Sequence, residues 1–179
     1  MSGSFENLDV PPTLISFAVT TAKTSDIITN DFKKAGHSVI LLSPEYGSDG
    51  LPVAESLIKL YDTVNSLFKS GCAVSAYTPG YGGIAEAVFK ACLGNGFGFE
   101  FDSALSLKDI FGYKYGSFLL EVTEDAGIGT KVGTITAEPF MAYAGSKVSM
   151  SKLTDLYEGK LESVYACNIA QPQGRIPQK

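Results

Sequence analysis

The spacing of apolar residues in the first quarter of the chain predicts a strand, a short helix and a second strand. Residues 13–20 (TLISFAVT) and 38–42 (SVILL) are apolar runs of strand length, and we expect both to be buried on two faces. The intervening TSDIITNDFKKAG is expected to form a helix, because Thr24 or Ser25 can cap its first amides and Gly36 suits the left-handed residue that ends it.

A longer helix is predicted after Pro52, and a third strand after that. The apolar residues that follow Pro52 recur at intervals of three and four, so they share one helical face. They are Val53, Leu57, Leu60, Tyr61, Val64 and Leu67. Residues 72–77 (CAVSAY) have the composition of a strand, and the chain then passes through a glycine-rich turn into a second helix that begins at Ile84.

The second half of the chain is richer in strands. Residues 96–102 (GFGFEFD) alternate phenylalanine with glycine or acidic residues, which is the period of a half-buried strand. A brief helix (SLKDIFG), a strand pair at 117–122 and 131–136, and a short edge strand at 140–143 are expected next. The last segment, SMSKLTDLYEGKLESVY, has the spacing of an amphipathic helix. The sum is an α+β fold with helices packed on a mixed β-sheet.

Composition narrows the class of protein. The chain has 179 residues, 45% of them hydrophobic, which suits one ordinary core. A net charge of −5 with only 14 Lys and Arg argues against a nucleic-acid surface. The apolar runs are much shorter than the roughly 20 residues that span a bilayer, and no leader pattern is present, so we expect a cytoplasmic protein with no membrane partner. The cysteines, Cys72, Cys92 and Cys167, have irregular spacing that suggests neither a disulfide framework nor a zinc site.

Both ends have the composition of connecting segments. The opening MSGS resembles an expression tag, and the closing NIAQPQGRIPQK is polar and contains proline and glycine, as a linker does. We therefore assign residues 1–9 to a tag or linker, 10–165 to one domain and 166–179 to a linker, and we expect the chain to be a piece of a longer protein.

The stretch TPGYGGIAEAVFKACLGNGFG, residues 78–98, is the strongest candidate for chemistry. It places a glycine-rich loop between a strand and a helix N-terminus, where backbone amides and the helix dipole favour an anion. Gly82, Gly83 and the amide of Ile84 are the predicted contacts for a phosphate. The alternative is a tight turn that needs a positive φ, since the loop matches neither G-x-G-x-x-G nor G-x-x-x-x-G-K-[ST].

Other chemically capable residues have simpler interpretations. His37, the only histidine, follows a helix-ending glycine and is expected on a surface loop. Glu121 belongs with Glu124 and Asp125 to a strand end and turn, where acidic residues are common without a function. Glu86 lies in the first turn of the helix after the loop, where the helix dipole explains a carboxylate. Cys72 and Cys92 are expected to be small, inert core residues.

Two segments resemble a known family. VPPTLISFAVTTAKTSDIITNDFKKAGHSVILL and GGIAEAVFKACLGNGFGFEFD are similar to phosphoribosylformylglycinamidine synthase (FGAM synthase) of the long single-chain type, in the C-terminal half of its second AIR-synthase-like repeat. The resemblance runs from about Val10 to Val164. It implies an AIR-synthase-related fold and a part in the ATP-dependent conversion of formylglycinamide ribonucleotide, with glutamine-derived ammonia, in purine biosynthesis.

The resemblance also implies partners and site residues. ATP and Mg²⁺ would serve the full-length enzyme, and a phosphorylated small molecule would be its substrate. An ATP-binding N-terminal half and a glutaminase domain would complete the same chain, so this piece alone would be inactive. The phosphate-contact role of the family loop would fall to Gly82 and Gly83, with Ile84 opening the helix.

The loop departs from the family in one respect. Many relatives have a pattern like H-D-x-S-D-G-G-L, whereas this chain reads YTPGYGGI, with Thr78 and Tyr81 at the two acidic positions. A metal contact or an acid–base role is therefore not expected here, and no catalytic residue is assigned. The alternative function is a stand-alone module that binds a phosphorylated metabolite or a protein partner without catalysis.

Overall fold

The computed structural model describes residues 3–164 and is built on one seven-stranded sheet. The strand order is β4–β6–β3–β7–β5–β8–β9, and all neighbours are antiparallel except β5 and β8. The strands are β3 (Ser38–Leu42), β4 (Ala73–Tyr77), β5 (Gly98–Phe101), β6 (Phe118–Val122), β7 (Thr130–Thr136), β8 (Phe140–Tyr143) and β9 (Ser146–Ser149). The predicted α+β class with a mixed sheet is confirmed.

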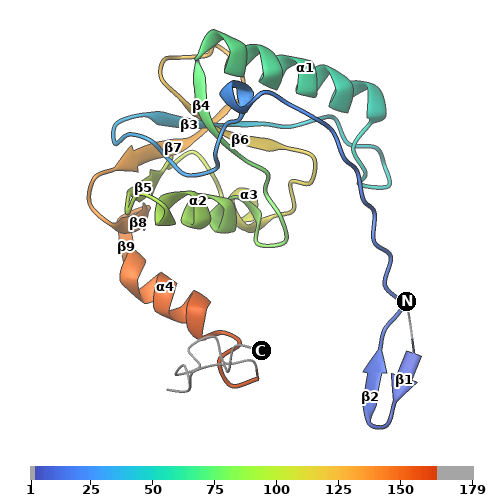
Figure 1. The fold of residues 1–179 in the computed structure, drawn as a ribbon. Coiled ribbons are helices and arrows are strands. Elements are labelled where there is room, and N and C mark those ends of the chain that lie inside the picture. Colours follow the sequence, from blue (N-terminus) through green and yellow to red (C-terminus); the bar gives the residue numbers. More distant parts are fainter. Residues whose placement is uncertain (1–2, 165–179) are drawn as a thin grey trace, which may run out of the picture.

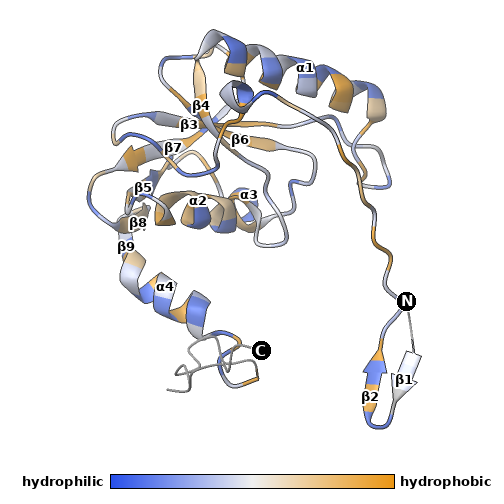
Figure 2. Ribbon diagram, viewed as in Figure 1, coloured by the Kyte–Doolittle hydropathy of each residue, from blue (hydrophilic) through white to orange (hydrophobic). Residues whose placement is uncertain are grey.

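Helices cover both faces of the sheet. α1 (Ala54–Ser70) lies on one face, and α2 (Gly83–Leu93), α3 (Leu107–Phe111) and α4 (Met150–Gly159) lie on the other (Figure 1). The core accordingly has two parts, one under α1 and a larger one under α2 and α3. Figure 2 shows the apolar central strands between these layers. No helix among the described residues is both long and apolar enough to cross a bilayer.

β3 is buried on both faces, as its continuous apolar run predicts. Val39 and Leu41 belong to the core under α2, while Ile40 and Leu42 belong to the core under α1. Successive side chains of a strand point to opposite faces, so a strand covered on both sides needs apolar residues at every position.

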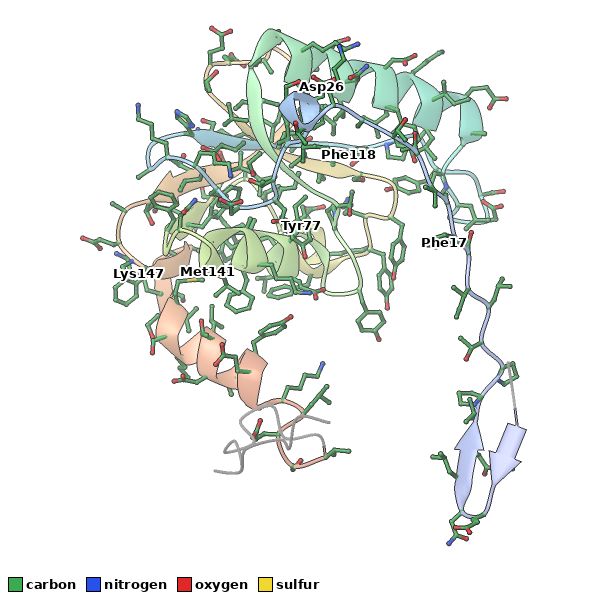
Figure 3. The ribbon with its side chains drawn as sticks, in the orientation of Figure 1. Phe17, Asp26, Tyr77, Phe118, Met141 and Lys147 are labelled. Carbon is green, nitrogen blue, oxygen red and sulfur yellow. The ribbon has the colours of Figure 1, made fainter. Side chains whose placement is uncertain are left out.

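The strand predicted for residues 13–20 is wrong. The segment is an extended arm that pairs with no strand among the described residues, and it joins the sheet-bearing body to a small separate hairpin of β1 (Gly3–Phe5) and β2 (Leu8–Val10). Its apolar side chains face solvent, with Leu14 96% and Phe17 86% exposed (Figure 3). The apolar pattern favours extended backbone but does not supply the neighbouring strand that would bury it.

The helix predicted between Thr24 and Gly36 is also wrong, although Gly36 does take a positive φ of 91°. Only a 3-10 turn, η1 (Thr24–Asp26), forms. Distant parts of the protein take the amides that a helix would use: the Phe32 amide donates to the carbonyl of Ala91. The segment TSDIITND is also rich in β-branched residues, Asn and Asp, which are weak helix formers.

Glu121 of β6 corrects the expectation of an ordinary strand-end acid. It is fully buried and accepts hydrogen bonds from the backbone amides of Lys33 (2.7 Å) and Lys34 (3.1 Å). Its Oε1 lies 2.7 Å from Nδ1 of His37, whose side chain is 18% exposed rather than on an open loop. This carboxylate therefore fastens residues 33–37 to the sheet.

The last strands differ from the expected pattern in one respect. β8 is not an edge strand, because it pairs with β5 on one side and with β9 on the other. Strand β9 is not predicted from the sequence. Ala144 and Gly145 both take a positive φ, as the two central residues of a tight hairpin do, and of the two only Gly145 is a signal in the sequence.

The cysteine predictions are confirmed for the two cysteines that the structure describes. Cys72 and Cys92 are free and buried. Burial raises the pKa of the Cys92 thiol to about 12, as expected of an inert core residue. Cys167 and the linker predicted for residues 166–179 lie outside the described residues.

Candidate functional site

The glycine-rich loop connects β4 to α2 by a tight, internally bonded turn. Gly80 and Gly83 form an isolated bridge, in which the Gly83 amide donates to the Gly80 carbonyl at 3.1 Å. The Gly82 amide donates to Oε2 of Glu86 at 2.8 Å. Two of the three amides predicted for a phosphate, those of Gly82 and Gly83, therefore already have acceptors inside the protein.

Gly83 is needed for its conformation and for close packing. Its φ is +65°, and a Cβ there would lie 2.7 Å from the carbonyl oxygen of Gly112 and 2.9 Å from that of Ile110. The turn with a positive φ, which the sequence left open as the alternative, is thus present at this residue. At Gly82 a Cβ would lie 2.6 Å from Cβ of Glu86, so this position too has no room for a side chain.

Glu86 and Lys90 form an ion pair one helical turn apart on α2. Lys90 Nζ donates to Oε1 of Glu86 at 2.6 Å, and the side chains are 27% and 34% exposed, respectively. The pKa of Glu86 is lowered, first by the Lys90 bond and then by the Gly82 amide, and the same pair raises the pKa of Lys90. Glu86 therefore stays ionised at neutral pH, and its carboxylate occupies the place where an anion would bind at the start of α2.

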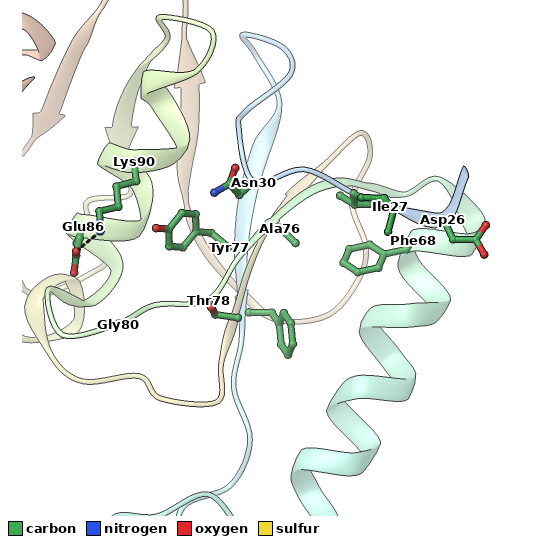
Figure 4. Close-up of a pocket in the computed structure, with 12 residues that line it drawn as sticks. Asp26, Ile27, Asn30, Phe68, Ala76, Tyr77, Thr78, Gly80, Glu86 and Lys90 are labelled. Carbon is green, nitrogen blue, oxygen red and sulfur yellow. Dashed lines mark hydrogen bonds and ion pairs between the residues drawn. The ribbon is translucent and has the colours of Figure 1, made fainter. Parts of the chain in front are cut away.

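A pocket of about 590 Å³ opens beside this pair. Figure 4 shows Glu86 and Lys90 on one side, Phe68 at the end of α1 on the other, and β4 between them. Tyr77 and Thr78 at the end of β4 contribute hydroxyl groups, and polar Asn30 also lines the pocket. The charged residues of the lining are Lys90 and two acids, Asp26 and Glu86, and Lys90 is the one cation among the described lining residues. An anionic ligand would therefore bind at the Lys90 ammonium in place of the Glu86 carboxylate.

The structure places the three predicted contacts differently. Gly82 is partly exposed and lines a second hollow beneath α4, whereas Gly83 and Ile84 are buried. The charged groups beside the loop are those of Glu86 and Lys90, both partly exposed, and their pairing was not expected from the sequence. Their signal was visible as a Glu and a Lys four residues apart in EAVFK.

Tyr81, which stands where the family pattern has an acidic residue, is part of an aromatic cluster. Its ring lies 5.6 Å from that of Tyr113, which lies 5.5 Å from that of Tyr115 in a stacked arrangement. The pKa of Tyr113 is raised, chiefly by its hydrogen bond with Tyr81. No group of three or more His, Cys, Asp or Glu side chains that suits a metal ion occurs within residues 3–164.

Comparison with solved structures identifies this architecture. A Thermotoga maritima PurL chain complexed with FGAR superposes with a TM-score of 0.59 over 73% of this chain, at 13% sequence identity. The fold is AIR-synthase-like. A PurL structure from T. maritima complexed with AMPPCP gives 0.59 over 74% at 14% identity, and the T. maritima PurLQS structure gives 0.58 over 72% at 12%.

These likenesses rest on three-dimensional structure alone. No protein-family model and no curated protein matches the sequence. The aligned region amounts to 30% of the first PurL chain and 28% of the other two, so this chain corresponds to less than a third of each. At such low identity the agreement establishes the AIR-synthase-like fold of the body.

Proposed function

We propose that this chain is an AIR-synthase-like domain of an ATP-utilising ligase of the FGAM synthase type, in which it helps to hold a phosphate group. One observation carries the proposal: the Gly82 amide and the Lys90 ammonium already bind an anion, the carboxylate of Glu86. A phosphate oxygen has the same preference for an amide and a cation at a helix N-terminus. In the proposed bound state the phosphate replaces the Glu86 carboxylate.

The proposal revises the site that the sequence predicted. Gly82 remains a phosphate contact, and Lys90 joins it. Gly83 and Ile84 shape the turn behind the contact, because both are buried. Tyr77 and Asn30 then face the remainder of the ligand from the pocket beside α2. The phosphate belongs to ATP or to formylglycinamide ribonucleotide, since PurL structures carry either FGAR or an ATP analogue.

The chemistry is proposed for a larger assembly, with an ATP-binding N-terminal half and a glutaminase domain supplying what this chain does not. In the reaction of that assembly, formylglycinamide ribonucleotide, ATP and ammonia from glutamine give the amidine, and positioning of charged groups dominates phosphoryl transfer. Mg²⁺ enters only as the counterion of the nucleotide. We propose a cytoplasmic location for the assembly and no activity for this chain alone.

A non-catalytic module is the second candidate, and the loop composition favours it. Thr78 and Tyr81 replace the acidic residues of the family pattern, while the pocket beside Lys90 is formed by this chain alone. In that case a phosphorylated metabolite would bind the isolated chain in the same place. Protein partners of the module would use the edge strand β4.

Replacing Glu86 by alanine is expected to strengthen phosphate binding. The substitution frees the Gly82 amide and the Lys90 ammonium and removes a negative charge, so the affinity for ADP should rise about tenfold, the worth of one charge-assisted hydrogen bond. Isothermal calorimetry with Mg-ADP and with formylglycinamide ribonucleotide measures the change. Glu55→Ala, an exposed acid on α1, removes the same charge far from the loop and is the matched control.

A double variant, Glu86→Ala with Lys90→Ala, distinguishes ligand binding at the site from the effect of net charge on the affinity. The proposal requires that this double variant loses the gain. Equal gains in Glu86→Ala and Glu55→Ala would reduce the effect to net charge and contradict the phosphate site. The module predicts the same affinity with and without the remaining domains, whereas the ligase predicts an affinity that rises when those domains are present.

A further inference from the structure

A second and larger hollow lies on the other side of α2, beneath α4. It has a volume of about 730 Å³ and is formed by α2, α3, β8, β9 and α4. Met141 on β8 and Lys147 on β9 lie at the end of the sheet from which α4 departs (Figure 3). The volume falls within the range of roughly 300–1,000 Å³ typical of small-molecule sites.

The walls of this groove are mainly aromatic and aliphatic. Buried Phe101 and Met141 are among its lining residues, and Phe111, which is 62% exposed, also lines it. On the α4 side, the ring of Tyr157 lies 5.6 Å from that of Phe89. Aromatic walls favour a ligand with a ring, because offset and edge-on ring contacts add to the free energy of apolar burial.

The charges of the groove are positive although the chain carries a net charge of −5. Lys147 and Lys160 line it, and Glu86 is the one acidic residue among the described lining residues. The Glu86 carboxylate is already bound to Lys90 and to the Gly82 amide. The Lys147 ammonium has no acceptor within the part of the chain that the structure describes. An anionic group on the ligand would provide one.

We propose that this groove binds a small amphipathic anion: an aromatic ring system that carries a carboxylate or a phosphate. The ring occupies the apolar wall of Phe101, Phe111 and Met141, and the anionic group pairs with Lys147. The groove adjoins the proposed phosphate contact, because Gly82 and Glu86 line it, but Lys90 does not, and the cations of the groove come from β9 and from the end of α4. The proposal rests on these cations and the aromatic wall and not on the proposed function.

The probe is 8-anilinonaphthalene-1-sulfonate, an aromatic anion whose fluorescence rises in apolar surroundings. The whole chain should bind it saturably with one site. Lys147→Glu should weaken binding at least tenfold, while Lys152→Glu, the same change on an exposed residue of α4, should leave it within twofold. Ala85→Phe places a ring in the groove from the partly buried side of α2 and should abolish binding without lowering the melting temperature.

Competition identifies the anionic group. Displacement of the probe by 1-naphthoate assigns a carboxylate, and displacement by 1-naphthyl phosphate assigns a phosphate. Equal losses in the Lys147 and Lys152 variants, or unchanged binding to Ala85→Phe, would overturn the site. So would displacement by ADP, which would merge the groove with the phosphate contact, or loss of probe binding as the chain self-associates, which would make the groove an interface between copies.

Discussion

Glu121→Ala is expected to cost about 3–5 kcal/mol of unfolding free energy, the range for breaking a buried ionic cluster. The carboxylate is fully buried and joins three groups of the segment 33–37 to β6: two backbone amides and the His37 ring. Its loss leaves the amides of Lys33 and Lys34 without that acceptor. Urea denaturation at pH 7 measures the change through the transition midpoint.

Two further variants define the origin of this effect. Glu124→Ala, an exposed acid three residues on, should stay within about 0.5 kcal/mol of the unmodified chain. Glu121→Gln keeps the shape but loses one acceptor oxygen and the charge, so an intermediate loss of about 2 kcal/mol is expected. A loss below about 1 kcal/mol for Glu121→Ala would show that the 33–37 segment is held by other contacts.

Gly83→Ala is expected to destabilise the fold by about 2–4 kcal/mol, from a positive φ together with steric overlap. The added Cβ would lie within 3 Å of the carbonyl oxygens of Gly112 and Ile110, which are backbone atoms and yield only if α3 shifts. Thermal and urea unfolding measure the loss.

Gly127→Ala is the matched control for Gly83→Ala. Gly127 also has a φ of +65°, but nothing lies within 4 Å of a Cβ there. The control should therefore lose only the cost of the conformation, about 1 kcal/mol. Equal losses at the two glycines would mean that α3 accommodates the side chain, which would remove close packing as the reason for glycine in the loop.

Local sequence patterns were enough to predict α1 and β3. The apolar residues of α1 repeat at helical spacing, and the helix ends at Gly71, a glycine with a φ of +75°. β3 shows one apolar residue after another because helices cover both faces of its sheet. In these elements the intrinsic preference and the burial agree, so the sequence alone carries the answer.

Long-range contacts decide the parts that were predicted wrongly. Residues 24–36 have plausible helix ends, yet acceptors far along the chain bind their amides, among them Glu121, 88 residues from Lys33. The arm at 13–20 has the composition of a strand, but pairing needs an edge that its own pattern does not encode. The burial of the Glu121 carboxylate near the end of β6 could not be predicted, because it depends on which segments pack over the sheet there.

The glycines of the loop are compatible with two structures in the sequence, and this ambiguity limits what can be predicted for the candidate site. Glycine signalled both a turn with a positive φ and an exposed row of amides, and the structure has the turn at Gly83. The group that acts on the Gly82 amide is a side chain four residues later, Glu86. The helix dipole by itself accounts for a carboxylate in the first turn of a helix, so the sequence does not predict its contact with the loop.

The most direct test of the phosphate site is a titration of the isotope-labelled chain with Mg-ADP, followed through the backbone amide signal of Gly82 and the side-chain signal of Lys90. The account predicts saturable shifts of both signals, larger in Glu86→Ala than in the unmodified chain, while the amide of Gly127 stays in place. Unchanged Gly82 and Lys90 signals at millimolar nucleotide, with the spectrum of a folded protein, would contradict it and leave the Glu86 carboxylate as the permanent occupant of the loop.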